Sequence, residues 1–347
     1  MGSPLAYARG SFGASQNRDR KGALSPRQAR VRALAKLNLS LKVPHKRPDG
    51  FHEIRTVFQA ISLGDVIDIE FTPGRRTSIE LESSVDIPDN LMVRAARTVM
   101  EAGRIAGRLR LRLDKRIPMG GGLGGGSSDA AAVLLAVPVL AGRDIPEATL
   151  LSLAASLGSD VPFFLHGGRA LGLGRGTELY PLTDLAPAPT LVVVPQVHVS
   201  TADAYLALAR ELTQDLSFQY ISNFQLHVWG SEEGYRLGEA LRFCENDFER
   251  VVFEQFPLLK SVKNRLTRLG ARPAMLTGSG SALFGIFRSR EEVTAALPAF
   301  AGLRAYPVTL IGRRRYQSMW RGWLREHIDP RGKGEQVAWP LPSRYAR

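Results

Sequence analysis

The sequence predicts a two-domain protein of class α+β, in which helices are combined with antiparallel or mixed sheets. Its 347 residues exceed what a single hydrophobic core usually holds, because domains have roughly 100–200 residues. Several segments alternate apolar and polar residues, which is typical of strands with one face in water and favours antiparallel or mixed pairing. Apolar residues make up 44% of the chain and charged residues 23%, the balance of a soluble globular protein. We therefore expect two lobes with the functional site in the cleft between them.

Regular elements can be assigned in the first half of the chain. Val66–Phe71 and Leu109–Asp114 each place three apolar side chains on one face, so both predict strands. Predicted helices span 90–103, 128–140 and 147–157. Pro138 predicts a kink or an early end of the second helix, and Gly158 stands where a C-cap is expected for the third.

A proline-rich connector, Ala186–Pro189, separates the two predicted domains. It precedes the apolar run Leu191–Val194, after which strands and helices resume. We therefore assign residues 31–189 to an N-terminal domain and residues 190–312 to a C-terminal domain.

The net charge of +13 is concentrated at the two ends. Residues 1–32 carry seven Lys/Arg and one acid, and residues 313–347 carry nine Lys/Arg and three acids, so each end has a charge of +6. Residues 1–30 predict a mobile tail, and 313–347 a basic extension without clear periodicity in its aromatic residues Tyr316, Trp320 and Trp323. The nearly neutral body does not favour a nucleic-acid-binding surface, which leaves the tails as the alternative place for one.

Cysteine and histidine usage excludes two classes of site. The single cysteine, Cys244, excludes an intramolecular disulfide, and the six histidines lack the spacing of zinc ligands. No stretch approaches the ~18 apolar residues of a membrane span, and the N-terminus has no apolar signal core. We expect a cytoplasmic protein.

The strongest motif is a glycine-rich loop between the strand at 109–114 and the helix that begins near Ser128. Its residues are Pro118, Met119, Gly120, Gly121, Gly122, Leu123, Gly124, Gly125, Gly126, Ser127 and Ser128. Glycines at a helix N-terminus allow the backbone amides to converge on a phosphate. A flexible linker is the alternative. No lysine follows the glycines, which excludes a Walker-type loop, and the alternating strand before them fits poorly to a dinucleotide-binding unit.

Two polar segments are candidates for catalysis. Lys36, Asn38 and Ser40 share one face of a predicted strand, which is either a solvated face or one wall of a site. Asp160 lies in a turn after a helix and before an apolar stretch. Such a carboxylate can act as a general base or can bond to the backbone of its own turn.

Two further segments have turn chemistry. The cluster Thr277–Ala282 contains two glycines between apolar segments and predicts a hairpin or a strand–helix turn. Phe51 and His52 follow a turn, where they can stack on a base and hydrogen-bond it, or pack in the core.

Together these segments resemble the GHMP small-molecule kinases over about residues 31–311. The resemblance rests on four ordered motifs at 35–39, 48–53, 118–128 and 158–163. It implies a two-lobed fold, with an N-terminal lobe like ribosomal protein S5, a C-terminal ferredoxin-like lobe and the active site between them. Within the family, the resemblance is to members that transfer the γ-phosphate of ATP to the 2-hydroxyl of a cytidine-diphosphate-linked methylerythritol, in isoprenoid precursor synthesis.

The resemblance also implies roles for the catalytic residues. The glycine-rich loop holds the ATP phosphates, Asp160 accepts the hydroxyl proton, and Lys36 holds Asp160 ionised and steadies the transferring charge. Mg²⁺ accompanies ATP, with Ser128 as a ligand. Asn90 and Lys115 stand where the family contacts the adenosine part of the nucleotide.

On the substrate side, the resemblance implies contacts to the methylerythritol and to the cytosine. Asn38 contacts the methylerythritol hydroxyls, Phe51 and Tyr205 sandwich the cytosine, and His52 bonds its edge. Thr277 and Gly278 also belong to the substrate-binding residues. The family usually has Tyr at the position of Phe51, which keeps stacking but loses a phenolic contact.

Three other interpretations differ in the residues they require. A homoserine or mevalonate kinase of the same family has the glycine-rich loop and lacks the cytidine clamp of Phe51, His52 and Tyr205. A binding protein without activity is disfavoured because Lys36 and Asp160 are both present. A nucleic-acid-binding protein would use the basic tails.

Overall fold

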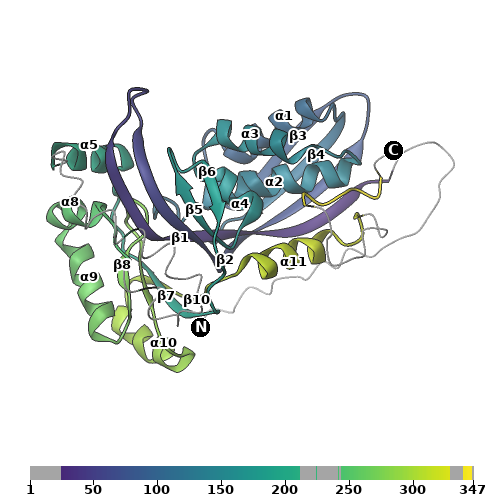
Figure 1. Cartoon of the computed structure of the whole chain (residues 1–347). Helices are drawn as coiled ribbons and strands as arrows, with labels where there is room; N and C mark the ends of the chain where they lie inside the picture. Colours follow the sequence, from purple (N-terminus) through teal and green to yellow (C-terminus); the bar gives the residue numbers. More distant parts are fainter. Residues whose placement is uncertain (1–24, 212–223, 225–240, 242–243, 329–338, 346–347) are drawn as a thin grey trace.

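The computed structural model describes residues 25–211, 224, 241, 244–328 and 339–345. These residues form two lobes, each built on its own sheet (Figure 1). Most of the predicted N-terminal tail lies outside the described residues. Its last residues do not, because the first strand, β1, begins at Arg27.

The first lobe is built on a long hairpin of β1 (Arg27–Lys46) and β2 (His52–Pro73). Because β2 is long, its first half pairs with β5 and its second half with β4, both antiparallel. A parallel pair of β3 with β4 makes the pairing mixed, as predicted. The other strands are β3 (Ser78–Ser83), β4 (Gly107–Asp114), β5 (Arg169–Leu173) and β6 (Glu178–Pro181).

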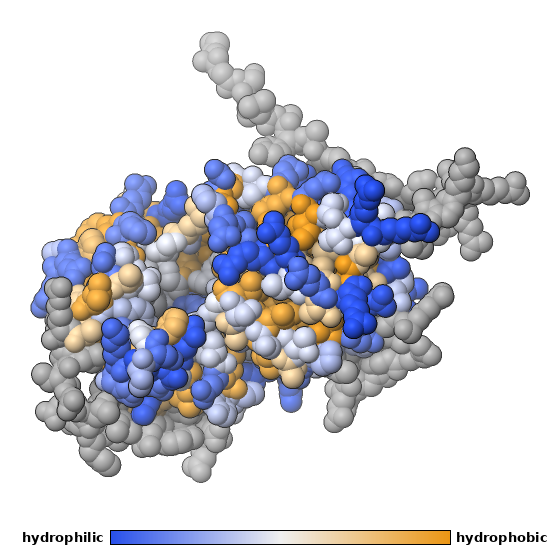
Figure 2. Space-filling model, turned by 90° about the horizontal axis from the view of Figure 1, so that it is seen from above, coloured by the Kyte–Doolittle hydropathy of each residue, from blue (hydrophilic) through white to orange (hydrophobic). Residues whose placement is uncertain are grey.

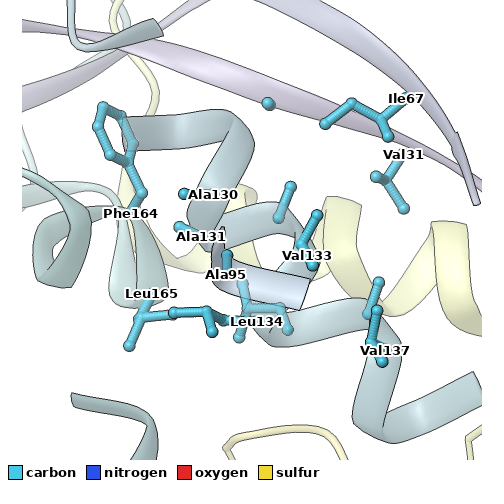
Figure 3. Close-up of a cluster of buried hydrophobic side chains, with 14 of the residues drawn as sticks. Val31, Ile67, Ala95, Ala130, Ala131, Val133, Leu134, Val137, Phe164 and Leu165 are labelled. Atoms are coloured by element: carbon cyan, nitrogen blue, oxygen red, sulfur yellow. The ribbon is translucent and has the colours of Figure 1, made fainter. Parts of the chain in front are cut away.

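Four helices cover one face of this sheet: α1 (Leu91–Ala102), α2 (Gly125–Ala141), α3 (Glu147–Leu157) and α4 (Val161–His166) (Figure 1). The alternation in β4 confirms its prediction, because its leucines are buried and its arginines exposed. Helix α2 lies in the centre, and its small side chains pack against residues such as Val31 and Ile67 of the hairpin (Figure 3). It runs through Pro138 to Ala141, so the predicted early end is wrong. The left-handed Gly142 ends it instead.

The second lobe contains a four-stranded antiparallel sheet in the order β10-β7-β9-β8. The strands are β7 (Pro189–Val194), β8 (Ala274–Leu276), β9 (Leu283–Ile286) and β10 (Arg304–Thr309). One face packs on helices that include α5 (Thr201–Glu211), α8 (Phe248–Gln255), α9 (Pro257–Arg268) and α10 (Arg290–Ala296), followed by a 3-10 helix at Leu297–Phe300. The other face packs on the hairpin, where Val192 and Phe284 meet Leu37 and Val57.

After β10 the chain returns to the first lobe as helix α11 (Arg313–Leu324), which runs beside β1 (Figure 1). Tyr316, Trp320 and Leu324 are buried in the core of that lobe. Their spacing of four residues places them on one helix face. The sequence alone shows no clear periodicity here, because the positions between these three residues also hold apolar side chains, Met319 and Trp323. No helix of the described residues is long and apolar enough to cross a membrane.

Candidate functional site

The glycine-rich loop forms a series of tight turns that leads directly into α2. Gly120, Gly122 and Gly124 all have left-handed φ values of 71°, 73° and 71°. Glycine adopts this conformation without steric cost. Gly124 is the N-cap of α2, so the loop ends where the unpaired amides of a 17-residue helix point outward. The loop can therefore bind an anion with backbone amides.

The loop also contacts the turn between β8 and β9 in the second lobe. A Cβ atom at Gly122 would lie 2.4 Å from the carbonyl oxygen of Thr277, and one at Gly278 would lie 3.3 Å from Cα of Gly122. The amide of Ala282 donates to the carbonyl of Gly121 at 3.2 Å. This packing fixes the loop between the lobes, which does not fit a flexible linker.

Lys36 and Asp160 meet beside the loop, although 124 positions separate them in the sequence. Nζ of Lys36 lies 3.4 Å from Oδ2 of Asp160, and the backbone amide of Lys36 donates to the carbonyl of Leu123 at 3.0 Å. Asp160 is the N-cap of α4, but its side chain makes no capping hydrogen bond. The carboxylate thus faces the lysine and not its own helix.

The polar face of β1 is buried, so it is not a solvated face. Lys36 and Asn38 are each 3% exposed, and Nζ of Lys36 donates to Oδ1 of Asn38 at 2.7 Å. Nδ2 of Asn38 donates to Oγ1 of Thr56 at 2.8 Å, and its backbone amide donates to Oγ1 of Thr277 at 3.1 Å. These bonds leave Asn38 as a link between the lysine and the second lobe.

Asn246 positions the turn at Thr277, and the sequence analysis missed it. Its Nδ2 donates to the carbonyls of Leu276 and Gly278, both at 2.9 Å. The side chain is 6% exposed. A single asparagine outside any motif gives no local signal of such a role. His198 was also missed, and a Cβ atom at Gly120 would lie 3.7 Å from its Nδ1.

The tip of the hairpin, with Phe51 and His52, and helix α5, with Tyr205, contribute the aromatic residues. The rings of His52 and Tyr205 are stacked, with centroids 4.7 Å apart and an angle of 22°. The ring of Phe51 is 48% exposed and lies 3.6 Å from the guanidinium carbon of Arg175. Burial and the charge of Asp160 raise the pKa of Tyr205 to about 12. Burial and the charge of Lys46 lower the pKa of His52, so its ring is neutral at pH 7.

Asn90 and Lys115 form contacts within the first lobe. Oδ1 of Asn90 accepts the amide of Met92 at 2.9 Å and caps α1. Nζ of Lys115 donates to Asp65 at 2.6 Å and to Asp129 at 2.7 Å, and its side chain is 5% exposed. A Cβ atom at Gly125 would lie 2.9 Å from this Nζ, so the lysine supports the start of α2.

The two carboxylates around Lys115 differ in their partners. Asp65 also accepts the amides of Arg116 at 2.5 Å and Ile117 at 2.7 Å, which hold the turn before the glycine-rich loop. Oδ1 of the buried Asp129 has no hydrogen-bond partner among the described residues. Burial and the neighbouring Asp65 raise the pKa of Asp129 to about 8. Asp129 therefore gives up its proton less readily than an aspartate in water.

The raised pKa of Asp129 predicts an unusual pH dependence of stability. Because folding raises the pKa of Asp129, the folded state binds more protons than the unfolded state between the ordinary value of 3.8 and about 8. Its contribution to the free energy of unfolding is thus present at low pH and is lost as the pH rises toward 8. We expect Asp129→Asn to lose less stability than the parent between about pH 6 and about pH 9 in denaturant titrations. Asp65→Asn is the contrasting variant: it removes the neighbouring charge that helps to raise this pKa, so it should also flatten the pH dependence, and the altered contacts to the amides of Arg116 and Ile117 should cost about 1–3 kcal/mol. Equal pH dependence in Asp129→Asn and the parent would contradict this assignment.

The structure therefore brings many of the predicted site residues to the junction of the two lobes. Figure 2 shows the described surface hollowed between the lobes when seen from above. The residues joined there by direct contacts are Lys36, Asn38, Gly122, Leu123, Gly124, Asp160, Thr277 and Gly278. Tyr205 and His52 are linked to them through the effect of Asp160 on Tyr205. Ser128 lies behind the loop, where its hydroxyl donates to the carbonyl of Leu34 at 2.7 Å.

Comparison with known proteins identifies both lobes. The family described as GHMP kinases N terminal domain matches residues 90–168, and the family GHMP kinases C terminal matches residues 232–302. The 4-diphosphocytidyl-2-C-methyl-D-erythritol kinase of Solibacter usitatus is 53% identical over 323 residues, which are 92% of this chain and 98% of that protein. The protein of the same name from Chlorobium chlorochromatii is 39% identical over 77% of this chain and 91% of its own length.

Solved structures agree with these matches. A crystal structure of 4-(cytidine 5'-diphospho)-2C-methyl-D-erythritol kinase has a TM-score of 0.67 and 37% identity, and the match covers 82% of this chain and 99% of that chain. Homoserine kinase from Cytophaga hutchinsonii has a TM-score of 0.63 at 20% identity, covering 82% of this chain and 95% of its own, and shares the fold alone. The predicted two-lobed α+β fold is confirmed. The chain is a kinase that belongs to the GHMP kinases, in the family of the 4-diphosphocytidyl-2-C-methyl-D-erythritol kinases.

Proposed function

We propose that the protein transfers the γ-phosphate of ATP to the 2-hydroxyl of 4-diphosphocytidyl-2-C-methyl-D-erythritol, a step of isoprenoid precursor synthesis. The observation that carries the proposal is the pair of Lys36 and Asp160, 3.4 Å apart beside a glycine-rich loop at the start of a helix. The named relatives at 53% and 39% identity support the choice of substrate.

In this proposal the glycine-rich loop binds the phosphates of ATP. Three left-handed glycines turn the backbone amides of the loop toward one side, and α2 adds the partial positive charge of its N-terminus. Lys115 and Asp65 act indirectly, because they hold the segment from which the loop starts. A direct contact of Lys115 or Asn90 with adenosine stays a prediction of the family resemblance.

Asp160 accepts the proton of the attacking hydroxyl in this mechanism. Its carboxylate is 30% exposed, so a substrate can reach it, and no bond to its own helix competes for it. The ammonium of Lys36 balances this charge and attracts the oxygens of the transferred phosphoryl group. Asn38, fixed by Lys36 and Thr56, would orient the methylerythritol hydroxyls.

The cytosine would bind between the hairpin tip and helix α5. Tyr205 presents a ring that already stacks on His52, and the neutral His52 can both donate and accept a hydrogen bond at a base edge. Phe51 directly precedes His52 in the sequence, and its ring is exposed. It would supply the second stacking surface for the cytosine. Thr277 and Gly278 form the wall on the side of the second lobe.

The family implies Mg²⁺, and the residues present fit it only as a partner of the nucleotide. The described part of the chain contains no group of three or more His, Cys, Asp or Glu side chains that could hold a metal. Mg²⁺ commonly binds through substrate phosphates and water with few protein ligands. Ser128, the ligand that the resemblance implies, is 2% exposed and donates to Leu34, so its hydroxyl would have to turn toward the loop to bind the ion. The ion supplies charge neutralisation on the phosphates when bound.

Parallel phosphorylation assays test the proposed substrate. The purified chain is incubated with ATP and, in separate reactions, with the cytidyl substrate, mevalonate or homoserine. We expect ATP consumption and a phosphorylated product with the cytidyl substrate only. Turnover of homoserine or mevalonate at a comparable kcat/KM would overturn the choice of substrate while leaving the kinase family intact.

Tyr205→Ala tests the cytosine site. Loss of a stacking ring typically costs about 1–3 kcal/mol, so we expect KM for the cytidyl substrate to rise roughly 5-fold to 150-fold. KM for ATP should stay within about twofold. Tyr205→Phe, which keeps the ring and its edge contact with Phe248, is the matched control and should behave like the parent. A rise in KM for ATP instead would identify Tyr205 as a core residue.

A further inference from the structure

The C-terminal segment, which the structure describes at residues 313–328 and 339–345, makes direct contact with α4, the helix that Asp160 precedes. The hydroxyl of Tyr316 in α11 donates to the carbonyl of Phe164 at 2.6 Å. The indole Nε1 of Trp339 donates to the carbonyl of Leu165 at 2.9 Å. Both carbonyls lie in the last turn of α4, where a helix has no amide partners of its own. Two side chains from one segment thus complete the end of a six-residue helix.

Helix α4 also contacts the glycine-rich loop. A Cβ atom at Gly124 would lie 2.8 Å from the ring of Phe164 and 3.1 Å from Cγ of Lys36. The ring of Phe163 packs on Phe58 at 5.0 Å. Figure 3 shows Phe164 and Leu165 against the alanines of α2. A helix this short moves as one body, so a shift at its end displaces Asp160 at its start.

The chain after α4 is shaped to receive α11. Gly167 and Gly168 have left-handed φ values of 63° and 74°. A Cβ atom at Gly167 would lie 2.3 Å from the ring of Tyr316, and one at Gly168 would lie 2.6 Å from Arg313. Any side chain at these positions would push α11 away. The close approach of α11 to this part of the chain therefore depends on two consecutive glycines.

The same segment also closes the end of α2. Oγ of Ser343 donates to the carbonyl of Val139 at 2.6 Å, and a Cβ atom at Gly142 would lie 2.8 Å from Tyr345. The matched family regions end at residue 302, before α11 begins. The contacts therefore come from residues that follow the matched family regions.

We propose that this C-terminal segment positions the catalytic carboxylate, with Tyr316 and Trp339 as positioning residues that act through α4. The inference rests on the proposed role of Asp160 as the base. Proton acceptance depends on placing the carboxylate within about 1 Å of its working position. Without the two hydrogen bonds α4 keeps its buried rings, and Asp160 loses its fixed distance to Lys36.

The test uses Tyr316→Phe and Trp339→Phe, which keep the rings and remove one donor each. We expect each variant to lower kcat about 3-fold to 10-fold and the double variant about 10-fold to 100-fold. KM for ATP and for the cytidyl substrate should stay within about twofold. Trp323→Phe is the control, since Trp323 lies in α11 like Tyr316, is half-buried like Trp339, and packs edge-on against Trp320. Circular dichroism and melting curves establish that all variants are folded at the assay temperature.

A second background separates positioning from general support. In Asp160→Asn the base is absent, so adding Tyr316→Phe should leave the residual turnover unchanged. An equal fold-loss in both backgrounds would overturn the inference, as would a kcat of the double variant within twofold of the Trp323→Phe control. Full activity of Asp160→Asn itself would instead overturn the proposed function. Gly167→Ala keeps both donor residues but displaces the Tyr316 ring and its hydroxyl, so it should reproduce the loss of kcat.

Discussion

Asp160→Asn is expected to lower kcat by two or more orders of magnitude while the protein stays folded. A neutral amide cannot accept the hydroxyl proton, and general-base catalysis typically contributes ~10²–10⁴. The Asp160 side chain makes no hydrogen bond to the amides at the start of α4, so the isosteric Asn removes no helix cap. Initial rates with the cytidyl substrate and ATP binding by calorimetry measure the two effects, and ATP affinity should be unchanged.

Asp203→Asn is the control for this substitution. Asp203 is exposed in the first turn of α5, so this substitution makes the same chemical change at a carboxylate that faces water. Its kcat should equal that of the parent. If Asp160→Asn keeps its turnover within tenfold of the parent, Asp160 is not the base, and the pair with Lys36 serves only to join α4 to β1.

The regular elements of the first lobe follow from local sequence patterns. The alternation of apolar and polar residues in Leu109–Asp114 is enough to specify a half-buried strand, because successive side chains of a strand point to opposite faces of the sheet. Glycines at 120, 122 and 124 indicate left-handed turns for the same local reason. Helix α11 escaped notice because its burial depends on a sheet edge formed by residues almost 300 positions earlier.

The site itself could be predicted only in part. Lys36 and Asp160 come together through the packing of α4 on the hairpin, and only the resemblance to a family suggested their pairing. The surroundings of Lys115 were beyond prediction for the same reason, since its two partners lie 50 and 14 positions away. The local sequence shows which residues carry charged or reactive side chains. Only long-range packing determines which of them form ion pairs.

Gly122→Ala is expected to be the most damaging change in the glycine-rich loop. The residue has a φ of 73°, which costs an L-amino acid about 1–2 kcal/mol. Its new Cβ would also lie 2.4 Å from the carbonyl oxygen of Thr277, a backbone atom that cannot rotate away. The loop and the turn at Thr277 must separate, which displaces the phosphate-binding amides. We expect kcat/KM to fall about 100-fold or more, because a misplacement of about 1 Å costs this much in a positioned site.

Gly302→Ala separates the two causes of this loss. Gly302 also has a left-handed φ, of 84°, but a Cβ atom there meets nothing within 4 Å. It should lower the free energy of unfolding by about 1–2 kcal/mol and leave kcat/KM unchanged. In Gly122→Ala the clash should add about 1–3 kcal/mol to that cost. Denaturant titrations and initial rates on both variants make the comparison. If the two variants lose equal stability and both stay active, the loop does not depend on its contact with Thr277, and the junction of the lobes is not what holds the phosphate site in shape.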